Sequence, residues 1–231
     1  MTTAFPLLRL PYLVLMPILE QMEFMERIAL SILSNRARMF LKLLKMKCEH
    51  ITLELNDCRL KMTVIFENSE KLKVNILMIG YQEVDLRYGH DYISRWPCTL
   101  PPMDYVLPIM DVTHCKSIKQ FIVFEIPQRD IFLAKLPKIL KKLPKIDEVI
   151  AEKTYRNCTS DSPLFKVLRI VLPVSSAVTI FYHVLKPEDF QEIFKGNFDA
   201  VTLRKYWDIS YFEMPNDDMK FSLERFDDDK R

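Results

Sequence analysis

The sequence predicts an α+β protein in which a helical segment comes first and strands follow. Three observations lead to this prediction. Residues 5–45 carry apolar side chains at helical spacing, and residues 51–78 alternate between apolar and polar side chains. Residues 104–204 then alternate between helix-like and strand-like stretches. We expect an N-terminal helical unit, a small antiparallel sheet and an irregular array of αβ units.

The N-terminal unit is predicted to contain three helices. After Pro11, apolar side chains form one helical stripe. The stripe consists of Val14, Leu15, Ile18, Leu19 and Met22. A second apolar run covers residues 24–33, and Ser34 or Asn35 can cap a third helix. Pro17 interrupts the first helix by removing a backbone hydrogen bond. So few residues cannot bury this much apolar surface among themselves, so it should meet the rest of the chain or another protein.

Three strands are expected next, at residues 51–55, 60–66 and 72–78, separated by short polar turns. Such a pattern is typical of an antiparallel meander with one buried face. Glycine and proline punctuate residues 80–102, for which we expect loop with one short strand near residues 83–87.

Four helix-then-strand units are expected after residue 103. Helices are predicted at residues 104–115, 129–143, 162–171 and 187–194, and strands at residues 120–126, 146–151, 177–183 and 200–204. Units of this length suit a leucine-rich-repeat-like array, although the leucine consensus itself is missing. The exposed strand face of such an array is a natural protein-binding surface.

Composition and motifs favour a binding protein over an enzyme. The chain is 49% hydrophobic with a net charge of +2, so nothing global favours nucleic acid or membrane as a partner. Its 3 glycines argue against a glycine-rich phosphate loop, and no Walker, G-x-S-x-G or H-E-x-x-H motif is present. The 5 cysteines and 4 histidines lack metal-ligand spacing. We therefore predict no catalytic residue, no cofactor and no metal.

The basic stretch at residues 135–145 has two readings. It is an amphipathic helix with leucine and isoleucine on one face and lysine on the other. We interpret it as a solvated helix packed on the core, with an anionic-lipid or nucleic-acid patch as the alternative. The scattered cysteines indicate reduced thiols, and no signal peptide or membrane span is recognisable. An intracellular location, cytoplasmic or nuclear, is expected.

The N-terminal residues carry a resemblance to a known family. Leu10-Pro11, the apolar first helix, Ile28-Ala29-Leu30-Ser31 and Ser34-Asn35-Arg36 together resemble an F-box, and the opening FPLLRLPYLVL is similar to that of the nematode F-box family. Further along, VSSAVTIFY, KPEDFQEIF, NFDAVTL and DISYFEMPNDDMKF look like the region leading into the type 2 F-box-associated domain of that family.

This resemblance implies a function and a set of contact residues. It implies docking to the Skp adaptor, and through it to the cullin complex, of an SCF-type E3 ubiquitin ligase. The implied Skp contacts are Leu10, Pro11, Val14, Ile18, Leu19, Met22, Ile28 and Leu30. The expected domains are an F-box at residues 4–47 and an F-box-associated αβ domain at residues 48–231, the latter shortened relative to the family.

Two hypotheses follow. In the first, the chain is a non-catalytic adaptor that recruits an unidentified protein substrate to the ligase. In the second, it is a ligase-independent interaction module whose N-terminal helices cap its own core. Pro17, Arg27 and the shortened C-terminal region favour the second hypothesis, because they depart from the usual F-box pattern.

Overall fold

The computed structural model describes residues 7–56, 59–78, 83–88, 91–124, 130–151, 163–182, 207–213 and 219–225. The N-terminal helices are η1 (Leu7–Arg9), α1 (Tyr12–Gln21), α2 (Phe24–Leu33), α3 (Asn35–Leu41) and η2 (Lys42–Leu44). The later helices are α4 (Met103–Val112), α5 (Asp130–Ile139), α6 (Pro163–Val171) and η3 (Leu172–Val174). The first five strands are β1 (Cys48–Asn56), β2 (Arg59–Phe66), β3 (Lys71–Leu77), β4 (Glu83–Tyr88) and β5 (Asp91–Pro97). The other five are β6 (Ser117–Val123), β7 (Lys145–Ala151), β8 (Ser175–Tyr182), β9 (Trp207–Glu213) and β10 (Met219–Arg225).

The strands of the described residues form one ten-stranded mixed sheet in the order β5-β4-β3-β2-β1-β6-β7-β8-β10-β9. Strands β1 to β5 are an antiparallel meander. Strand β1 also pairs with β6 in parallel, and β6, β7 and β8 continue in parallel. The predicted α+β class is confirmed. The meander and the αβ units share one sheet because β1 has a hydrogen-bonding partner on each edge.

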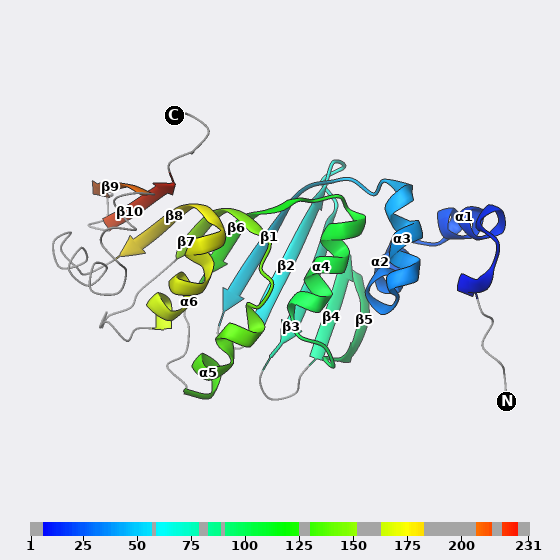
Figure 1. Ribbon diagram of the computed structural model, residues 1–231, viewed down its shortest axis with the longest axis horizontal. Coiled ribbons are helices and arrows are strands. Elements are labelled where there is room, and N and C mark those ends of the chain that lie inside the picture. The colour runs from blue at the N-terminus through cyan, green and yellow to red at the C-terminus, as the bar shows by residue number, and fades with distance from the viewer. Residues whose placement is uncertain are drawn as a thin grey trace.

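Helices α4, α5 and α6 lie on the same face of this sheet (Figure 1). The topology explains this arrangement. Each connection between neighbouring parallel strands is normally right-handed, and β6, β7 and β8 follow one another in a single direction, so their crossover helices fall on one side. The burial of side chains in β1 is consistent with helices on one face only. Ile51, Leu53 and Leu55 have no exposed surface, whereas Glu54 between them is only half-buried. We call the side without these helices the open face.

The amphipathic stretch at residues 135–145 packs as a core-facing helix and turn. Leu136, Ile139 and Leu140 are buried, while Lys138 and Lys141 are exposed. The apolar side was therefore assigned correctly, and Lys138 and Lys141 face solvent as expected of a solvated helix face.

Local patterns located most of the other elements too. The strand expected near residues 83–87 is β4, but β5 was missed because Pro97 and the surrounding turn residues suggested loop. Strands β9 and β10 were also not predicted. The helix expected at residues 187–194 and the strand expected at residues 200–204 lie outside the described residues.

The described residues contain neither a membrane-spanning helix nor a cluster of metal-ligand side chains. No helix there is long and apolar enough to cross a membrane. In the same part of the chain, no three His, Cys, Asp or Glu side chains gather where they could hold a metal ion.

Candidate functional site

Helices α1, α2 and α3 are joined by side chains that cap their ends. Ser34 Oγ accepts a hydrogen bond from the Ala37 amide at 3.2 Å, which confirms one of the two predicted caps of α3. Glu23 and Glu26 form a capping box at the start of α2. These caps satisfy amide groups that a helix start leaves unpaired. They allow three short helices with tight connections to form from about thirty residues.

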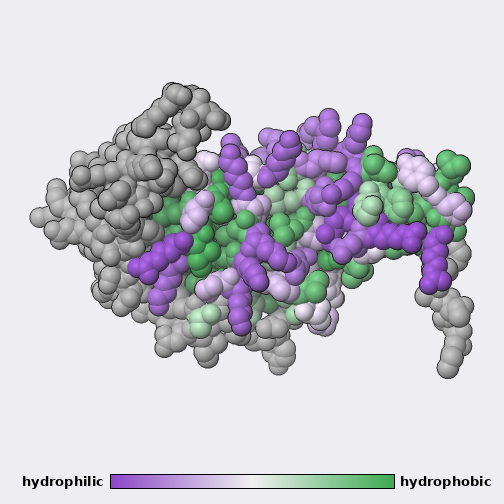
Figure 2. Space-filling view, viewed as in Figure 1, coloured by the Kyte–Doolittle hydropathy of each residue, from purple (hydrophilic) through white to green (hydrophobic). Residues whose placement is uncertain are grey.

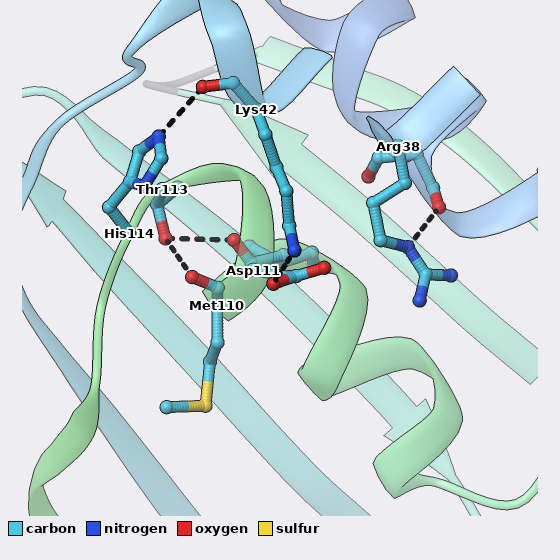
Figure 3. A network of polar contacts seen from close by, with 8 residues as sticks. Arg38, Lys42, Met110, Asp111, Thr113 and His114 are labelled. Carbon is cyan, nitrogen blue, oxygen red and sulfur yellow. Dashed lines mark hydrogen bonds and ion pairs between the residues drawn. The ribbon is translucent and has the colours of Figure 1, made fainter. Parts of the chain in front are cut away.

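Two arginines bind the C-terminal ends of the preceding helices. Arg27 of α2 donates to the carbonyl oxygens of Met22 at 2.9 Å and of Glu20 at 2.5 Å, at the end of α1. Arg38 of α3 donates to the Ser31 carbonyl at 3.1 Å, near the end of α2 (Figure 3). A cation at a helix C-terminus is favourable because it meets unpaired carbonyls and the negative end of the helix dipole. Arg27 thus has a structural role at a position where an F-box commonly has an apolar residue.

Pro17 does not break α1, which runs unbroken from Tyr12 to Gln21. Its side chain is exposed, so the ring faces solvent and does not disturb the packed side of the helix. The carbonyl that would have accepted its missing amide hydrogen belongs to Leu13, which is 84% exposed. Water can satisfy that carbonyl, which explains how the helix tolerates the proline.

The N-terminal helices carry an apolar surface. Among the described residues, all the exposed large apolar side chains except Leu100 lie between residues 12 and 43. They are Tyr12, Leu13, Val14, Leu33, Met39 and Leu43. Figure 2 shows hydrophobic residues at the surface of the end of the molecule where α1 lies. Such a concentration of exposed apolar side chains is typical of a protein-interaction site. We call these six residues the apolar surface.

The predicted Skp contacts divide into three groups by burial. Pro11 and Val14 are exposed. Leu10, Ile18, Met22 and Leu30 are half-buried. Leu19 and Ile28 have no exposed surface and pack inside the core. Six of the eight thus reach the surface, and the two remaining positions serve the fold.

Sequence reasoning missed several members of the apolar surface. Leu13, Leu33, Met39 and Leu43 were absent from the predicted contact set, although they are among the most exposed apolar side chains. A signal existed in principle, because α1 and α2 are apolar over more of their circumference than one buried stripe requires. The pattern does not say which apolar stripe turns inward.

Contacts made by α2, α3 and η2 hold the N-terminal helices against the sheet and α4 on one side. Phe24 of α2 contacts Phe66 of β2 edge to face, with ring centroids 4.8 Å apart, and stacks on Tyr88 of β4 at 5.2 Å. Lys42 Nζ forms an ion pair with Asp111 Oδ1 of α4 at 2.5 Å, and His114 Nε2 lies 2.8 Å from the Lys42 carbonyl oxygen (Figure 3). Both α2 and α3 contact α4. We call this set of contacts the junction.

A pair of half-buried thiols lies at the edge of the junction. A side-chain contact with the neighbouring Cys115 thiol lowers the pKa of Cys48 to about 7, against the opposing effect of burial. The same contact, together with burial, raises the pKa of Cys115. Cys48 Sγ also lies 3.9 Å from the Thr113 carbonyl oxygen. A thiol with a pKa near neutrality is a better nucleophile than an ordinary cysteine.

The N-terminal helices correspond to a known protein domain. Residues 7–49 match the F-box domain. The F-box spans α1 to α3 and ends at the start of β1, so the match identifies a domain and leaves most of the chain unassigned. No curated protein and no solved structure matches the chain.

The F-box is a protein-interaction domain that typically binds the Skp adaptor within SCF complexes, and F-box proteins are typically non-catalytic adaptors. A partner-binding role of the F-box would explain the apolar surface, which the sheet leaves uncovered.

Proposed function

We propose that this protein docks through its F-box on the Skp adaptor of an SCF-type ubiquitin ligase and recruits a target protein to it. The observation that carries the proposal is the apolar surface on the matched F-box, where Leu13 is 84% exposed and Met39 is 70% exposed. Leaving such side chains in water forgoes about 25 cal/mol for each Å² that burial would remove from solvent. A partner that covers them gains that free energy.

We further propose that residues 48–231 are an F-box-associated αβ domain of the nematode type 2 kind, and that its open face holds the target. The strands predicted to carry recognition residues place Gln120, Ile122, Glu148 and Ile150 on that face, half-buried between neighbouring strands. The contribution to ubiquitin transfer would be proximity, because a tethered target has a raised local concentration near the ubiquitin donor. The bond-forming chemistry would then belong to other subunits, in the cytoplasm or nucleus.

Co-expression with the Skp adaptor, followed by size-exclusion chromatography, tests the docking. The unaltered chain should co-elute with Skp in equal amounts. Val14→Asp places a charge in the apolar surface at a side chain that is 49% exposed, so it should abolish co-elution without unfolding the chain. Leu100→Asp is the matched control, because Leu100 is 43% exposed and lies outside the F-box. Retained co-elution of the Val14→Asp variant would contradict docking through this surface.

The junction supports a second candidate function. Phe24, Lys42 and His114 bind the F-box helices to β2, β4 and the end of α4. A ligase-independent interaction module whose helices cap its own core would have the same contacts. The chromatography separates the two functions, since this module should elute apart from Skp at micromolar concentration.

A further inference from the structure

The open face of the sheet is hollowed over β2 to β5. The hollow has a volume of about 500 Å³, within the range of about 300–1,000 Å³ that is typical of binding pockets. Its lining alternates with the buried rows: Lys61 lies between buried Leu60 and Met62, and Asn75 lies between buried Val74 and Ile76. The hollow therefore lies on the side of the sheet opposite the core, and it is independent of the apolar surface of the F-box.

The lining is polar and carries an excess of positive charge. The cations are Arg59, Lys61, Lys73, Arg87 and Arg95. Glu83 and Asp85 are the acidic members. With full ionisation, five positive and two negative charges leave a net charge of +3 among the described lining residues. A concave surface with this excess attracts anions.

Some of these charges are already paired with one another. Lys61 Nζ pairs with Glu54 at 2.8 Å, Arg87 with Asp85 at 2.8 Å and Arg95 with Glu83 at 3.2 Å. Arg59 and Lys73 have neither an ion pair nor a side-chain hydrogen bond within the described part of the chain. These two cations are the ones available to an anionic partner.

The strand register places the two cations at opposite ends of the hollow. Arg59 lies opposite Leu77, and Lys73 is four positions before Leu77 on β3. Four residues of extended chain span about 13 Å. The row between them is Lys61, Asn75, Asp85 and Arg95, which are paired across β2 to β5. An extended segment lying along the strands would pass over this row and reach both cations.

Asp85 in that middle row has an unmet hydrogen-bonding requirement. The residue is 8% exposed, its Oδ2 accepts from Arg87 at 2.9 Å, and its Oδ1 is buried without a hydrogen-bond partner. Oδ1 is shielded from solvent and Oδ2 is paired with Arg87, so the Asp85 carboxylate presents little of its negative charge to a ligand in the hollow.

We propose that this hollow binds an extended acidic segment of the target protein. Carboxylates four residues apart pair with Arg59 and Lys73, one at each end of the hollow. Each end of the hollow offers one cation unpaired within the described residues, which can pair with one carboxylate. Phosphate groups are typically held by several clustered arginines. Nucleic acid fits less well because the described lining residues include no aromatic side chain for base stacking. The inference deepens the proposed function, since it gives the chemistry of the target.

Fluorescence anisotropy with the full chain, in the absence of Skp, tests the proposal. The probe is a labelled peptide of alternating glutamate and serine, which places a carboxylate on the same side at every second residue. A peptide with glutamine in place of glutamate is the neutral probe, and one with phosphoserine in place of glutamate is the phosphate probe. The glutamate peptide should bind, more weakly as salt is raised, and the glutamine peptide should not.

Matched variants locate the binding. Arg59→Glu combined with Lys73→Glu should weaken binding of the glutamate peptide by about tenfold or more, the effect of losing two charge contacts of about 1 kcal/mol each. Lys166→Glu makes the same kind of charge change at an exposed residue of α6, on the face of the sheet opposite the hollow. It should leave binding unchanged. Asp85→Ala removes a negative charge from the lining, so it should tighten binding of the glutamate peptide, and weaker binding would contradict the charge argument.

The proposal is overturned if the glutamate and glutamine peptides bind alike, if only the phosphate probe binds, or if the double variant matches Lys166→Glu. These outcomes are separate from the docking test, because Skp is absent from the assay. Conversely, co-elution of the Arg59→Glu/Lys73→Glu variant with Skp verifies that the variant is folded and that the F-box is unaffected.

Discussion

The F-box helices and the sheet handle their apolar side chains in opposite ways. Strands β1 to β3 bury their leucine, isoleucine and valine rows and place lysine, asparagine and threonine on the other side. No strand residue whose surroundings are described is an exposed large apolar side chain. Helices α1 to α3 each bury some apolar side chains and leave others in solvent, among them Leu13, Leu33 and Met39. The difference indicates that the sheet's core is complete, whereas the helices retain a surface for a partner.

The largest expected effect on stability distinguishes a buried from an exposed leucine of α1. Leu19→Ala removes a fully buried side chain from α1 and should lower the free energy of unfolding by about 3 kcal/mol. Leu13→Ala makes the same change in the same helix at an exposed side chain, so the loss should stay within about 0.5 kcal/mol. Urea unfolding followed by circular dichroism measures both.

Leu53→Ala in β1 extends this comparison to the sheet, where Leu53 has no exposed surface and the cost should resemble that of Leu19→Ala. We expect one unfolding transition in every variant, because the junction joins the two regions. Two separate transitions, one for the helices and one for the sheet, would contradict that coupling.

A smaller loss of stability is expected when a side chain that binds the end of a helix is removed. Arg27→Ala removes two hydrogen bonds to carbonyls at the end of α1 and should cost about 1 kcal/mol. Arg36→Ala removes the same charge from an exposed position of α3 and should be close to neutral. Equal midpoints of urea unfolding for the two variants would mean that Arg27 contributes charge alone.

The smallest effect on stability, and a clear one on reactivity, is expected at the thiol pair. Cys48 has a folded pKa of about 7 against an ordinary value of 9.0, so its reaction with iodoacetamide should rise through neutral pH. Cys98, whose pKa is raised by burial, is the internal control and should react only at higher pH. Peptide mapping by mass spectrometry measures both sites.

The sign of the accompanying stability change follows from proton binding. Between about pH 7 and pH 9 the folded chain has lost the Cys48 proton and the unfolded chain still holds it. Stability therefore rises with pH across this window, and this contribution is lost as pH falls through about 7. Cys115→Ala removes the side-chain contact that lowers the pKa of Cys48, so it should move the reactivity of Cys48 to higher pH.

The sequence predicted elements that depend on local pattern. Alternation located β1 to β3, and helical spacing located α4 and α6, because the buried row or stripe can be read from neighbouring residues. Pairing between distant strands has no such local signal. The parallel contact of β1 with β6, which joins the meander to the αβ units, forms between residues such as Leu53 and Phe121.

The candidate site was predictable in outline and less so in detail. Leu10, Pro11 and Val14 could be named from their resemblance to a motif, and they lie at or near the surface. The buried positions of Leu19 and Ile28 depend on how three helices pack together, which their own periodicity does not determine. The hollow was invisible for a similar reason. Arg59 and Lys73 lie on different strands, and only the register of β2 and β3 brings them onto one face.

The junction also sets the orientation of the sheet's open face relative to the F-box. Lys45, Met46 and Lys47 alone separate η2 from β1, and Phe24 and Lys42 hold the helices against the sheet. A flexible connection would let a captured target sample many orientations, at a concentration set by linker length. Here the connection is stiff. Under the proposed function, the choice among acceptor lysines on the target would depend on the angle between sheet and F-box, and a few inserted glycines after Lys45 should broaden that choice.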